Sequence, residues 1–255
     1  MESRFEPLSL REREVLLAVY EGCRTRNEVA EKVGLSAPHL SRIFKKLTSS
    51  RLITLEDGVA SLLFKGELHA IFYDVFSRYE RLFESIDLNR YILDDIPENL
   101  LHRMYELSNV ITIESSREIF QPHPTVIDNM IKSDYVVGYG RMFYPEYAQL
   151  FLKLARDGVM TEAIINEKTL DEIRELYSSE LDGYLRCPRS KLLVSRRNFN
   201  FSIILTDSAF FMSLFFKNGT LDYTKFYAWY DEDGRRWGRD LVEFLKKQSY
   251  RVESV

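Results

Sequence analysis

Four cations stand close together in a stretch of the chain that carries no acid. In the segment 36–55 the charged residues are Arg42, Lys45, Lys46 and Arg51, and no Asp or Glu occurs there. Guanidinium and ammonium groups neutralise phosphate oxygens, and arginine also reads base edges in the DNA major groove. The segment therefore predicts contact with nucleic acid, provided that these side chains share one exposed surface.

A helix-turn-helix would present such a surface. Thr25 and Glu28 have the S/T-x-x-E spacing of a capping box, which predicts the start of a helix. Gly34 accepts the positive φ of a sharp turn. Ser36 then caps a second helix, and Pro38 suits its first turn, where a missing N–H costs nothing.

The second helix divides into two faces. Leu40, Ile43, Phe44 and Leu47 recur at helical spacing and predict a buried side. The opposite side would enter the major groove, as recognition helices do. We predict these DNA-contact residues, with the last two nearest the DNA backbone: Ser36, His39, Ser41, Arg42, Lys45, Lys46 and Arg51.

Flanking elements complete a winged helix. An apolar stripe predicts a helix over residues 9–20, and the segments 52–55 and 59–63 predict a β-hairpin around the turn 56–58. The alternative is another small helical domain with a solvated basic face. Caps, turn and hairpin agree with one another, which favours the winged helix.

A long helix is predicted over residues 64–86. Apolar residues recur in it with the alternating spacing of four and three that is typical of a heptad seam. A winged helix reads two half-sites as a dimer, so we predict a homodimer helix rather than one that packs only on its own domain. The predicted dimerisation residues are Leu68, Phe72, Val75, Tyr79, Leu82 and Ile86.

Helices and strands alternate after a junction at residues 87–97. We predict helices at 98–107, 123–133, 145–156, 168–178 and 231–248, and strands at 110–114, 134–139, 160–165, 191–195, 201–207 and 209–216. Such alternation predicts an α/β domain with a mixed or mostly parallel sheet. The predicted fold class is therefore a two-domain α+β and α/β protein: a winged helix at 1–63, a linking dimerisation helix at 64–93 and an α/β effector-sensing domain at 94–255.

Polar side chains follow several of these strands. Ligands of open α/β sheets bind outside the carboxyl ends of the strands. An arginine there could clamp an acid group, and tyrosines could line the walls. The alternative is a surface arginine and ordinary packing tyrosines. The predicted ligand-binding residues are Tyr139, Arg141, Tyr144, Asn166, Thr206 and Asp207.

Catalytic and metal-binding patterns are weak. None of the four histidines lies three or four residues from another His or Cys, and Cys23 and Cys187 form no redox or ligand motif. Gly138 and Gly140 follow a strand, but the third glycine of a dinucleotide fingerprint is missing. The acidic runs at 94–95 and 231–233 lie in a junction and at a helix start, where acids favour the helix dipole. We predict no catalytic residue, metal or cofactor.

Composition sets the remaining bounds. The 255 residues are 45% hydrophobic with a net charge of −4, so a basic surface can only be local. No apolar run approaches the roughly 20 residues that cross a bilayer, and the N-terminus lacks an apolar signal region. The sequence predicts a cytoplasmic protein without a membrane partner.

Four parts of the sequence resemble archaeal transcriptional regulators of the methanogenesis-regulator type. They are the helix-turn-helix and the segments 94–110, 123–140 and 218–245, with Ile96-Pro97, Gly219-x-x-Asp222 and Trp237-Gly238 as the best marks. The resemblance implies an arsenical-repressor-like winged helix joined to a distinctive middle and C-terminal domain. It implies a cytoplasmic, dimeric, DNA-binding regulator and names no ligand.

The segment 151–166 also resembles the phospholipase-D-like sensor domain of some archaeal sugar-responsive regulators. Enzymes of that fold use His-x-Lys, and here the residues two after the histidines are Ser41, Ile71, Met104 and Thr125. If that fold is shared, its catalysis is absent. We expect a DNA-binding regulator that senses a small molecule or partner. The alternatives are an enzyme that the winged helix targets and a protein-binding transcription adaptor.

Overall fold

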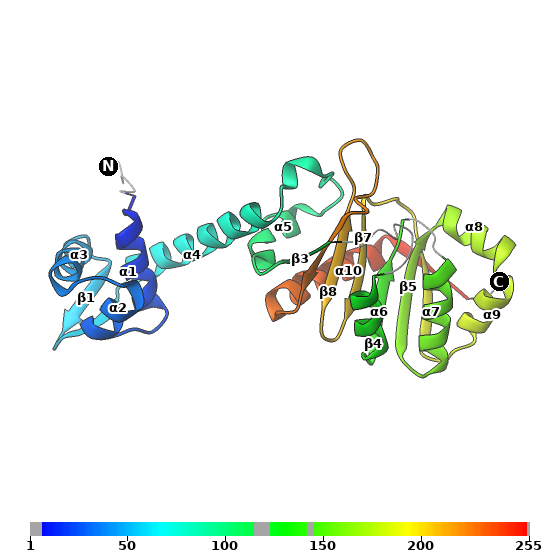
Figure 1. Ribbon diagram of the computed structural model, residues 1–255, viewed down its shortest axis with the longest axis horizontal. Coiled ribbons are helices and arrows are strands. Elements are labelled where there is room, and N and C mark those ends of the chain that lie inside the picture. The colour runs from blue at the N-terminus through cyan, green and yellow to red at the C-terminus, as the bar shows by residue number, and fades with distance from the viewer. Residues whose placement is uncertain (1–6, 115–122, 142–144, 254–255) are drawn as a thin grey trace. The chain divides into compact units, whose positions relative to one another are not determined.

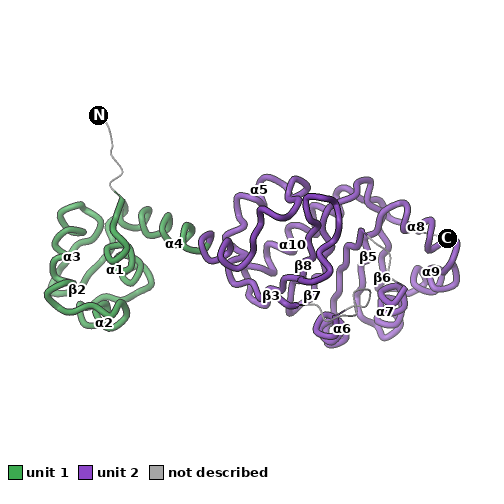
Figure 2. Tube along the Cα trace, turned by 45° about the horizontal axis from the view of Figure 1, so that its top comes forward, with its two compact units in different colours: residues 1–78 green, residues 79–255 purple. Residues whose placement is uncertain are grey.

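The computed structural model describes residues 7–114, 123–141 and 145–253. Contacts within the chain divide it into two compact units, residues 1–78 and 79–255, drawn in green and purple in Figure 2. The division falls inside the long helix that the sequence assigns to a linker. Each unit is described by itself below.

Unit 1 begins with three helices around one apolar core. They are α1 (Leu10–Tyr20), α2 (Arg26–Val33) and α3 (Ala37–Ser49). Leu16 of α1, Val29 of α2 and Phe44 of α3 are fully buried in this core. The predicted periodic apolar residues therefore do face one another.

A hairpin follows the helices. Strands β1 (Ile53–Glu56) and β2 (Val59–Leu62) are antiparallel and are joined by a tight turn at Asp57 and Gly58. The backbone N–H of Ala60 also donates to the carbonyl of Arg24 at 2.7 Å. The hairpin is thus tied to the start of α2, and three helices and a two-stranded hairpin make up this unit.

Helix α4 (Phe64–Ser85) leaves the hairpin at a close approach. A Cβ on Gly66 would lie 1.8 Å from the carbonyl oxygen of Leu52, so only glycine fits there. Ala70 and Tyr73 pack into the core of unit 1. Leu82 and Ile86 instead belong to the core of unit 2.

Unit 2 is built on an eight-stranded sheet. Its helical elements are η1 (Leu88–Arg90), α5 (Glu98–Leu101), η2 (Met104–Leu107), α6 (Pro124–Ile131), α7 (Pro145–Arg156), α8 (Glu167–Leu176), α9 (Ser178–Leu185) and α10 (Glu232–Lys247). Its strands are β3 (Ile111–Glu114), β4 (Tyr135–Tyr139), β5 (Met160–Asn166), β6 (Ser190–Ser195), β7 (Phe201–Thr206), β8 (Phe210–Leu214), β9 (Lys225–Trp229) and β10 (Ser249–Val252).

The sheet has the order β10-β6-β5-β4-β7-β8-β9-β3. Only β4, β5 and β6 are parallel to one another. The pairs β4–β7, β7–β8, β8–β9, β3–β9 and β6–β10 are antiparallel. The sheet is therefore mixed, which is the first of the two arrangements that the sequence predicts.

Helices cover both faces of this sheet (Figure 1). On one face α10, α5 and η2 enclose a core that contains Tyr139, Trp229 and Trp237. On the other face α6, α7, α8 and α9 pack over β5, β6 and β7 and enclose a second core around Phe151 and Leu192. Neighbouring residues of one strand thus enter different cores, as the period of two requires.

Several elements differ from the sequence prediction. The helix expected at 98–107 is broken into α5 and η2, and the strands β9 and β10 and the helix α9 are additional. Trp229 lies on β9 and meets α10 at Gly234, where a Cβ would lie 2.4 Å from the tryptophan Cβ. Among the described residues no helix is both long and apolar enough to span a bilayer.

Candidate functional site

The turn between α2 and α3 forms as the sequence predicts. Thr25 Oγ1 accepts from the Glu28 N–H at 3.3 Å, and Glu28 Oε2 accepts from the Thr25 N–H at 2.9 Å. Gly34 ends α2 in the left-handed region with φ of 64°. Ser36 occupies the N-cap position of α3, but its side chain makes no cap hydrogen bond, which corrects its predicted capping role; Pro38 lies in the first turn. Together these local features fix the start of α3.

Helix α3 has one buried and one exposed side. Leu40, Ile43, Phe44 and Leu47 are buried against the other helices, which confirms the predicted inward face. All seven residues predicted to contact DNA are exposed: Ser36, His39, Ser41, Arg42, Lys45, Lys46 and Arg51. The helix therefore holds a polar, basic surface away from its own core.

The cations on this surface are not equivalent. Lys46 Nζ lies 2.8 Å from Glu12 Oε1 of α1, whose carboxylate is nearly buried. Burial raises the pKa of Glu12, but hydrogen bonds from Lys46 and the Ser9 N–H outweigh it and leave the pKa below its usual value. Lys46 therefore ties α3 to α1. Arg42 and Lys45 have no carboxylate partner in residues 7–114, 123–141 and 145–253.

The far side of α4 carries an exposed apolar surface, which we call the α4 surface. It lies in unit 1 and consists of Phe64 (75% exposed), Leu68 (51%), Ile71 (42%), Phe72 (52%) and Phe76 (42%). Exposed apolar patches larger than a few hundred square ångströms are uncommon on monomeric proteins and are a feature of interaction surfaces.

The structure corrects the predicted dimer seam. Leu82 and Ile86 are buried in the core of unit 2, and the Tyr79 hydroxyl donates to the carbonyl of His102 at 2.8 Å. These three residues are committed within their own unit. Leu68 and Phe72 are exposed as predicted, and Val75 is half-buried between them and Tyr79. The regular heptad spacing therefore extends from exposed residues of α4, such as Leu68, to Leu82 and Ile86, which are buried in unit 2.

A cavity lies in unit 2 between the sheet and the helices α6 to α9. Its volume is about 250 Å³. Gly138, Ala163, Ser202 and Ser213 lie along its floor on four strands. Its walls include His123, Tyr147, Phe151, Ile173, Tyr177, Glu180, Leu181, Tyr184, Phe211 and Phe226. A concave, mainly apolar cavity with a few polar groups is the usual form of a small-molecule site.

The predicted ligand-binding residues do not come together at this cavity. Tyr139 points into the core on the α10 side, where its hydroxyl accepts from the Phe199 N–H at 2.9 Å. Burial raises its pKa to about 12. Arg141 donates to Asn200 Oδ1 and lies 4.9 Å over the ring of Phe215. Tyr139 and Arg141 are thus held by other residues of the unit.

Asn166 has a capping role. Its Oδ1 accepts from the Thr169 N–H at 2.8 Å at the start of α8, and its Nδ2 donates to the carbonyl of Arg141 at 2.8 Å. Asn166 and Arg141 therefore lie together at the carboxyl ends of β5 and β4, as predicted.

Thr206 and Asp207 lie at the other end of the strands, near the start of β4, which corrects the prediction that they lie beside Arg141 and Asn166. Strand β7 runs antiparallel to β4, so Thr206 pairs with Val136 at the beginning of β4 rather than with its end. Tyr144 lies outside the described residues.

The residues that line the cavity are harder to identify from the sequence. On β4, β5, β7 and β8 small residues occupy positions that face the helices: Gly138, Ala163, Ser202 and Ser213. One small residue on the same side of each of four strands leaves space above the sheet, because small side chains do not fill it. Nothing in the spacing of Tyr147, Tyr177 or Tyr184 showed that their helices would enclose it.

The marks of the predicted family resemblance have structural roles. Asp222 Oδ2 accepts from the Tyr91 hydroxyl at 2.7 Å, and that hydroxyl lies 2.9 Å from the Tyr227 hydroxyl. Burial raises the pKa of Asp222, but hydrogen bonds from Thr224 and Tyr91 outweigh it and lower the pKa. A Cβ on Gly238 would lie 2.6 Å from the ring of Phe210. These residues tie unit 2 together.

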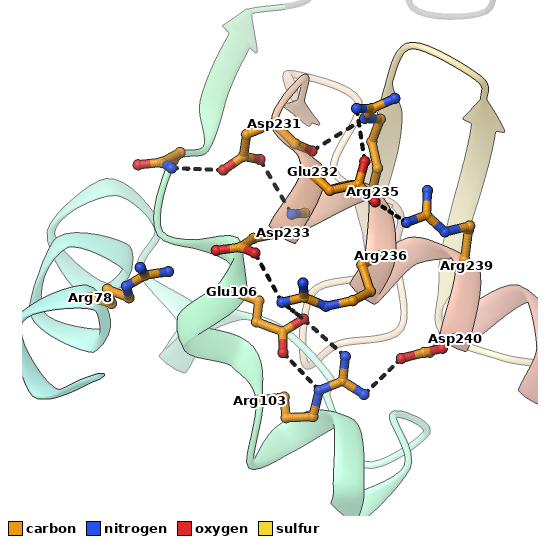
Figure 3. A network of polar contacts seen from close by, with 12 residues as sticks. Arg78, Arg103, Glu106, Asp231, Glu232, Asp233, Arg235, Arg236, Arg239 and Asp240 are labelled. Carbon is orange, nitrogen blue, oxygen red and sulfur yellow. Dashed lines mark hydrogen bonds and ion pairs between the residues drawn. The ribbon is translucent and has the colours of Figure 1, made fainter. Parts of the chain in front are cut away.

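A polar network joins η2 to α10 (Figure 3). Arg103 donates to both carboxylate oxygens of Glu106 at 2.8 and 2.9 Å and to Asp240 Oδ2 at 2.7 Å. Arg236 lies 3.4 Å from Glu106 and 2.9 Å from Asp233. Glu106, Asp233 and Asp240 each face an arginine, so the network cross-links two elements.

The acidic runs are also structural. Asp95 Oδ2 accepts from the backbone and side-chain nitrogens of Asn200 at 3.0 and 2.6 Å. Asp231 caps α10 by accepting from the Gly234 N–H at 3.3 Å. Within the described part of the chain, no group of three or more His, Cys, Asp or Glu residues could hold a metal ion.

Comparison with solved structures gives only distant likenesses. The archaeal chromatin protein TrmBL2 has 15% identity and a TM-score of 0.44, covering 98% of this chain and 96% of that one. An IclR-family transcriptional regulator from Rhodococcus sp. has 12% identity and a TM-score of 0.22, covering 97% and 96%. The O-methyltransferase NcsB1 from neocarzinostatin biosynthesis has 15% and 0.23, covering 72% and 64%. These likenesses support no assignment of function by themselves.

Sequence comparison is more informative for unit 2. No curated protein sequence matches this chain. The family model described as the middle domain of the methanogenesis regulatory protein FilR1 matches residues 119–248, which is about half of the chain. That match confirms the resemblance to archaeal regulators of the methanogenesis-regulator type that the sequence predicts. The chain belongs to the family of the methanogenesis regulatory protein FilR1.

Proposed function

We propose that this chain is a transcriptional regulator whose unit 1 binds duplex DNA as a homodimer and whose unit 2 receives the signal. The exposed side of α3 carries the proposal. There Arg42 and Lys45 are exposed and free of carboxylate partners among the described residues, opposite a fully packed apolar side. A rigid helix with this division suits the major groove.

The remaining predicted contact residues fit around this centre. Ser36, His39 and Ser41 lie on the exposed side of α3 and reach base edges or phosphates. Arg51 follows α3 in the left-handed region with φ of 56° and is exposed. Lys46 contributes mainly by holding α3 on α1. A protomer therefore offers few phosphate contacts, and one copy alone binds weakly.

A dimer supplies the missing affinity. The α4 surface belongs to the helix that follows the wing, and its apolar side chains would be covered by the same surface of a second copy. A two-fold interface of this kind places two copies of α3 for two half-sites. In this proposal the protein works on chromosomal DNA in the cytoplasm.

Unit 2 acts as a receiver rather than as an enzyme. Its acidic residues cap a helix, pair with arginines or hold a loop, as Asp231, Glu106 and Asp95 do. Groups committed in this way are not available for proton transfer. The regulatory family of this unit supports the same reading.

Selection of bound sequences from random duplex DNA, followed by a mobility shift, tests the proposal. The variant Arg42→Ala/Lys45→Ala removes two cations from each protomer and four from a dimer. If each cation neutralises one phosphate, the slope of log K against log salt falls by roughly 3.6, since each phosphate contributes about 0.9.

The matched control is Lys168→Ala/Arg186→Ala. Lys168 on α8 and Arg186 directly after α9 are exposed, at 87% and 77%, and the double change removes the same charge. The control is expected to keep the selected sequence and its salt slope. Unchanged retention of DNA by the Arg42/Lys45 variant would overturn the assignment of α3.

A further inference from the structure

The two faces of the unit 2 sheet are packed unequally. On the side of α10, Ile164, Ile203 and Met212 are at most 3% exposed. Their strand neighbours on the other side, which include Ala163, Ser202, Ile204 and Ser213, are only half-buried although helices lie above them. Native cores are close-packed, so this difference shows a hollow rather than a loose core.

The hollow has a structural cause in the floor. Gly138 pairs with Ala163 on β5 and Ser202 pairs with Ser213 on β8, so four small residues lie in adjoining registers. Helix α7 approaches the sheet over Gly138, where a Cβ would lie 2.8 Å from the ring of Phe151. Beyond that contact the small side chains do not reach the helices.

The lining defines the chemistry of an occupant. Most of the wall is aromatic or aliphatic, and the Tyr184 hydroxyl is already engaged with the carbonyls of Thr161 and Lys191 at 3.2 Å each. Ser202 and Ser213 are opposite one another on β7 and β8, and their hydroxyls make no hydrogen bond to another described residue. Such a site offers a large apolar contact with a few hydrogen bonds.

The same lining argues against strongly polar ligands. A sugar buries many hydroxyls, each of which needs a partner. A phosphate ester needs cations, whereas the described lining includes two carboxylates, Glu180 and Asp222, and a single cation, Lys225. Lys225 lies on β9 between Thr224 and the inward-facing Phe226, at the rim of the hollow.

We propose that this cavity binds a compact, uncharged, mainly apolar molecule with an aromatic or branched aliphatic body and one or two polar groups that meet Ser202 and Ser213. A cavity of about 150 Å³ accepts benzene, so 250 Å³ accommodates about ten non-hydrogen atoms. The role of this ligand as a signal to unit 1 rests on the proposed function, whereas its binding to unit 2 does not depend on that function.

The test measures binding to the full chain by calorimetry and by thermal unfolding. The probes are indole, 4-methylphenol and cyclohexanol, with glucose and inorganic phosphate as polar comparators. At least one apolar probe is expected to bind saturably and to raise the unfolding temperature. The polar comparators are expected to do neither.

Variants locate the site. Ser213→Leu fills the hollow and is expected to weaken the apolar probe at least tenfold, and Ala163→Leu provides a second filling change. Ser179→Leu makes the same chemical change on the exposed side of α9 and is expected to bind like the original protein. Circular dichroism verifies that each variant is folded.

The outcomes separate the two proposals. Absence of saturable binding by every apolar probe, tighter binding of glucose or phosphate, or unchanged binding in folded Ser213→Leu and Ala163→Leu overturns the cavity assignment. If an apolar probe binds at the cavity but no duplex DNA is retained, the ligand class stands and the proposed function fails. If DNA is retained without any probe binding, the reverse holds.

Discussion

Replacing Leu68 and Ile71 together by glutamate is expected to split the proposed dimer. The two side chains are 51% and 42% exposed and lie three residues apart on the same side of α4. Glutamate is a good helix former, so α4 itself should persist. The change places a charge where a second copy would have to cover an apolar side chain.

The exposed fractions set the size of the effect. Burying a whole Leu or Ile side chain contributes about 1.5–3 kcal/mol, and roughly half of each is still exposed, so covering the rest contributes about 1 kcal/mol. A two-fold dimer contains four such side chains, which gives about 4 kcal/mol. The dissociation constant of the dimer should therefore rise by about 10³-fold, because 1.4 kcal/mol is a factor of ten.

Sedimentation equilibrium over a range of concentrations measures this change. The control Leu176→Glu/Ile131→Glu alters the same residue types on helices of unit 2, where they are 67% and 50% exposed. The control should keep the original dissociation constant. If the folded Leu68/Ile71 variant associates as the original protein does, or if the control dissociates equally, the α4 surface is not the interface.

Two further predictions concern stability. Burial raises the pKa of Glu162, but hydrogen bonds from Lys191 and a second lysine outweigh it and lower the pKa from 4.5, so its stabilising effect is full above pH 4.5 and is lost as the pH falls below. Glu162→Gln should therefore lower the free energy of unfolding at pH 7, measured by urea denaturation, by about 3 kcal/mol, and this deficit should shrink towards pH 3; a constant deficit would contradict the ion-pair argument. Gly238→Ala should cost about 1–3 kcal/mol, because its Cβ would meet the Phe210 ring at 2.6 Å. Gly183→Ala should be nearly neutral in thermal unfolding, because its Cβ would meet a flexible arginine end at 3.2 Å and Leu152 at an ordinary contact distance of 3.5 Å.

Unit 1 could be predicted closely because local rules determine it. The capping pair Thr25 and Glu28 and the left-handed Gly34 act within a few residues, and each needs no knowledge of the rest of the fold. The buried side of α3 follows from helical period alone. The charge on Lys46 is the exception, since its partner Glu12 comes from another helix.

Helix α4 shows where periodicity stops being sufficient. The spacing from Leu68 to Ile86 is regular, yet its first part is exposed and its last part is buried in unit 2. A heptad pattern states which residues share a side of a helix, but not what covers that side. Burial there is decided by the elements of unit 2, which lie far along the chain.

The cavity was hidden for a related reason. Ser202 and Ser213 are separated by a strand, a turn and half a strand, and they become neighbours only because β7 and β8 are antiparallel. Because β7 is also antiparallel to β4, Thr206 lies at the opposite end of the strands from Asn166. Strand direction depends on connections, and the alternation of polar and apolar residues is identical for both directions. The sequence could therefore indicate which residues face the helices, while the position of a site required the topology of the sheet.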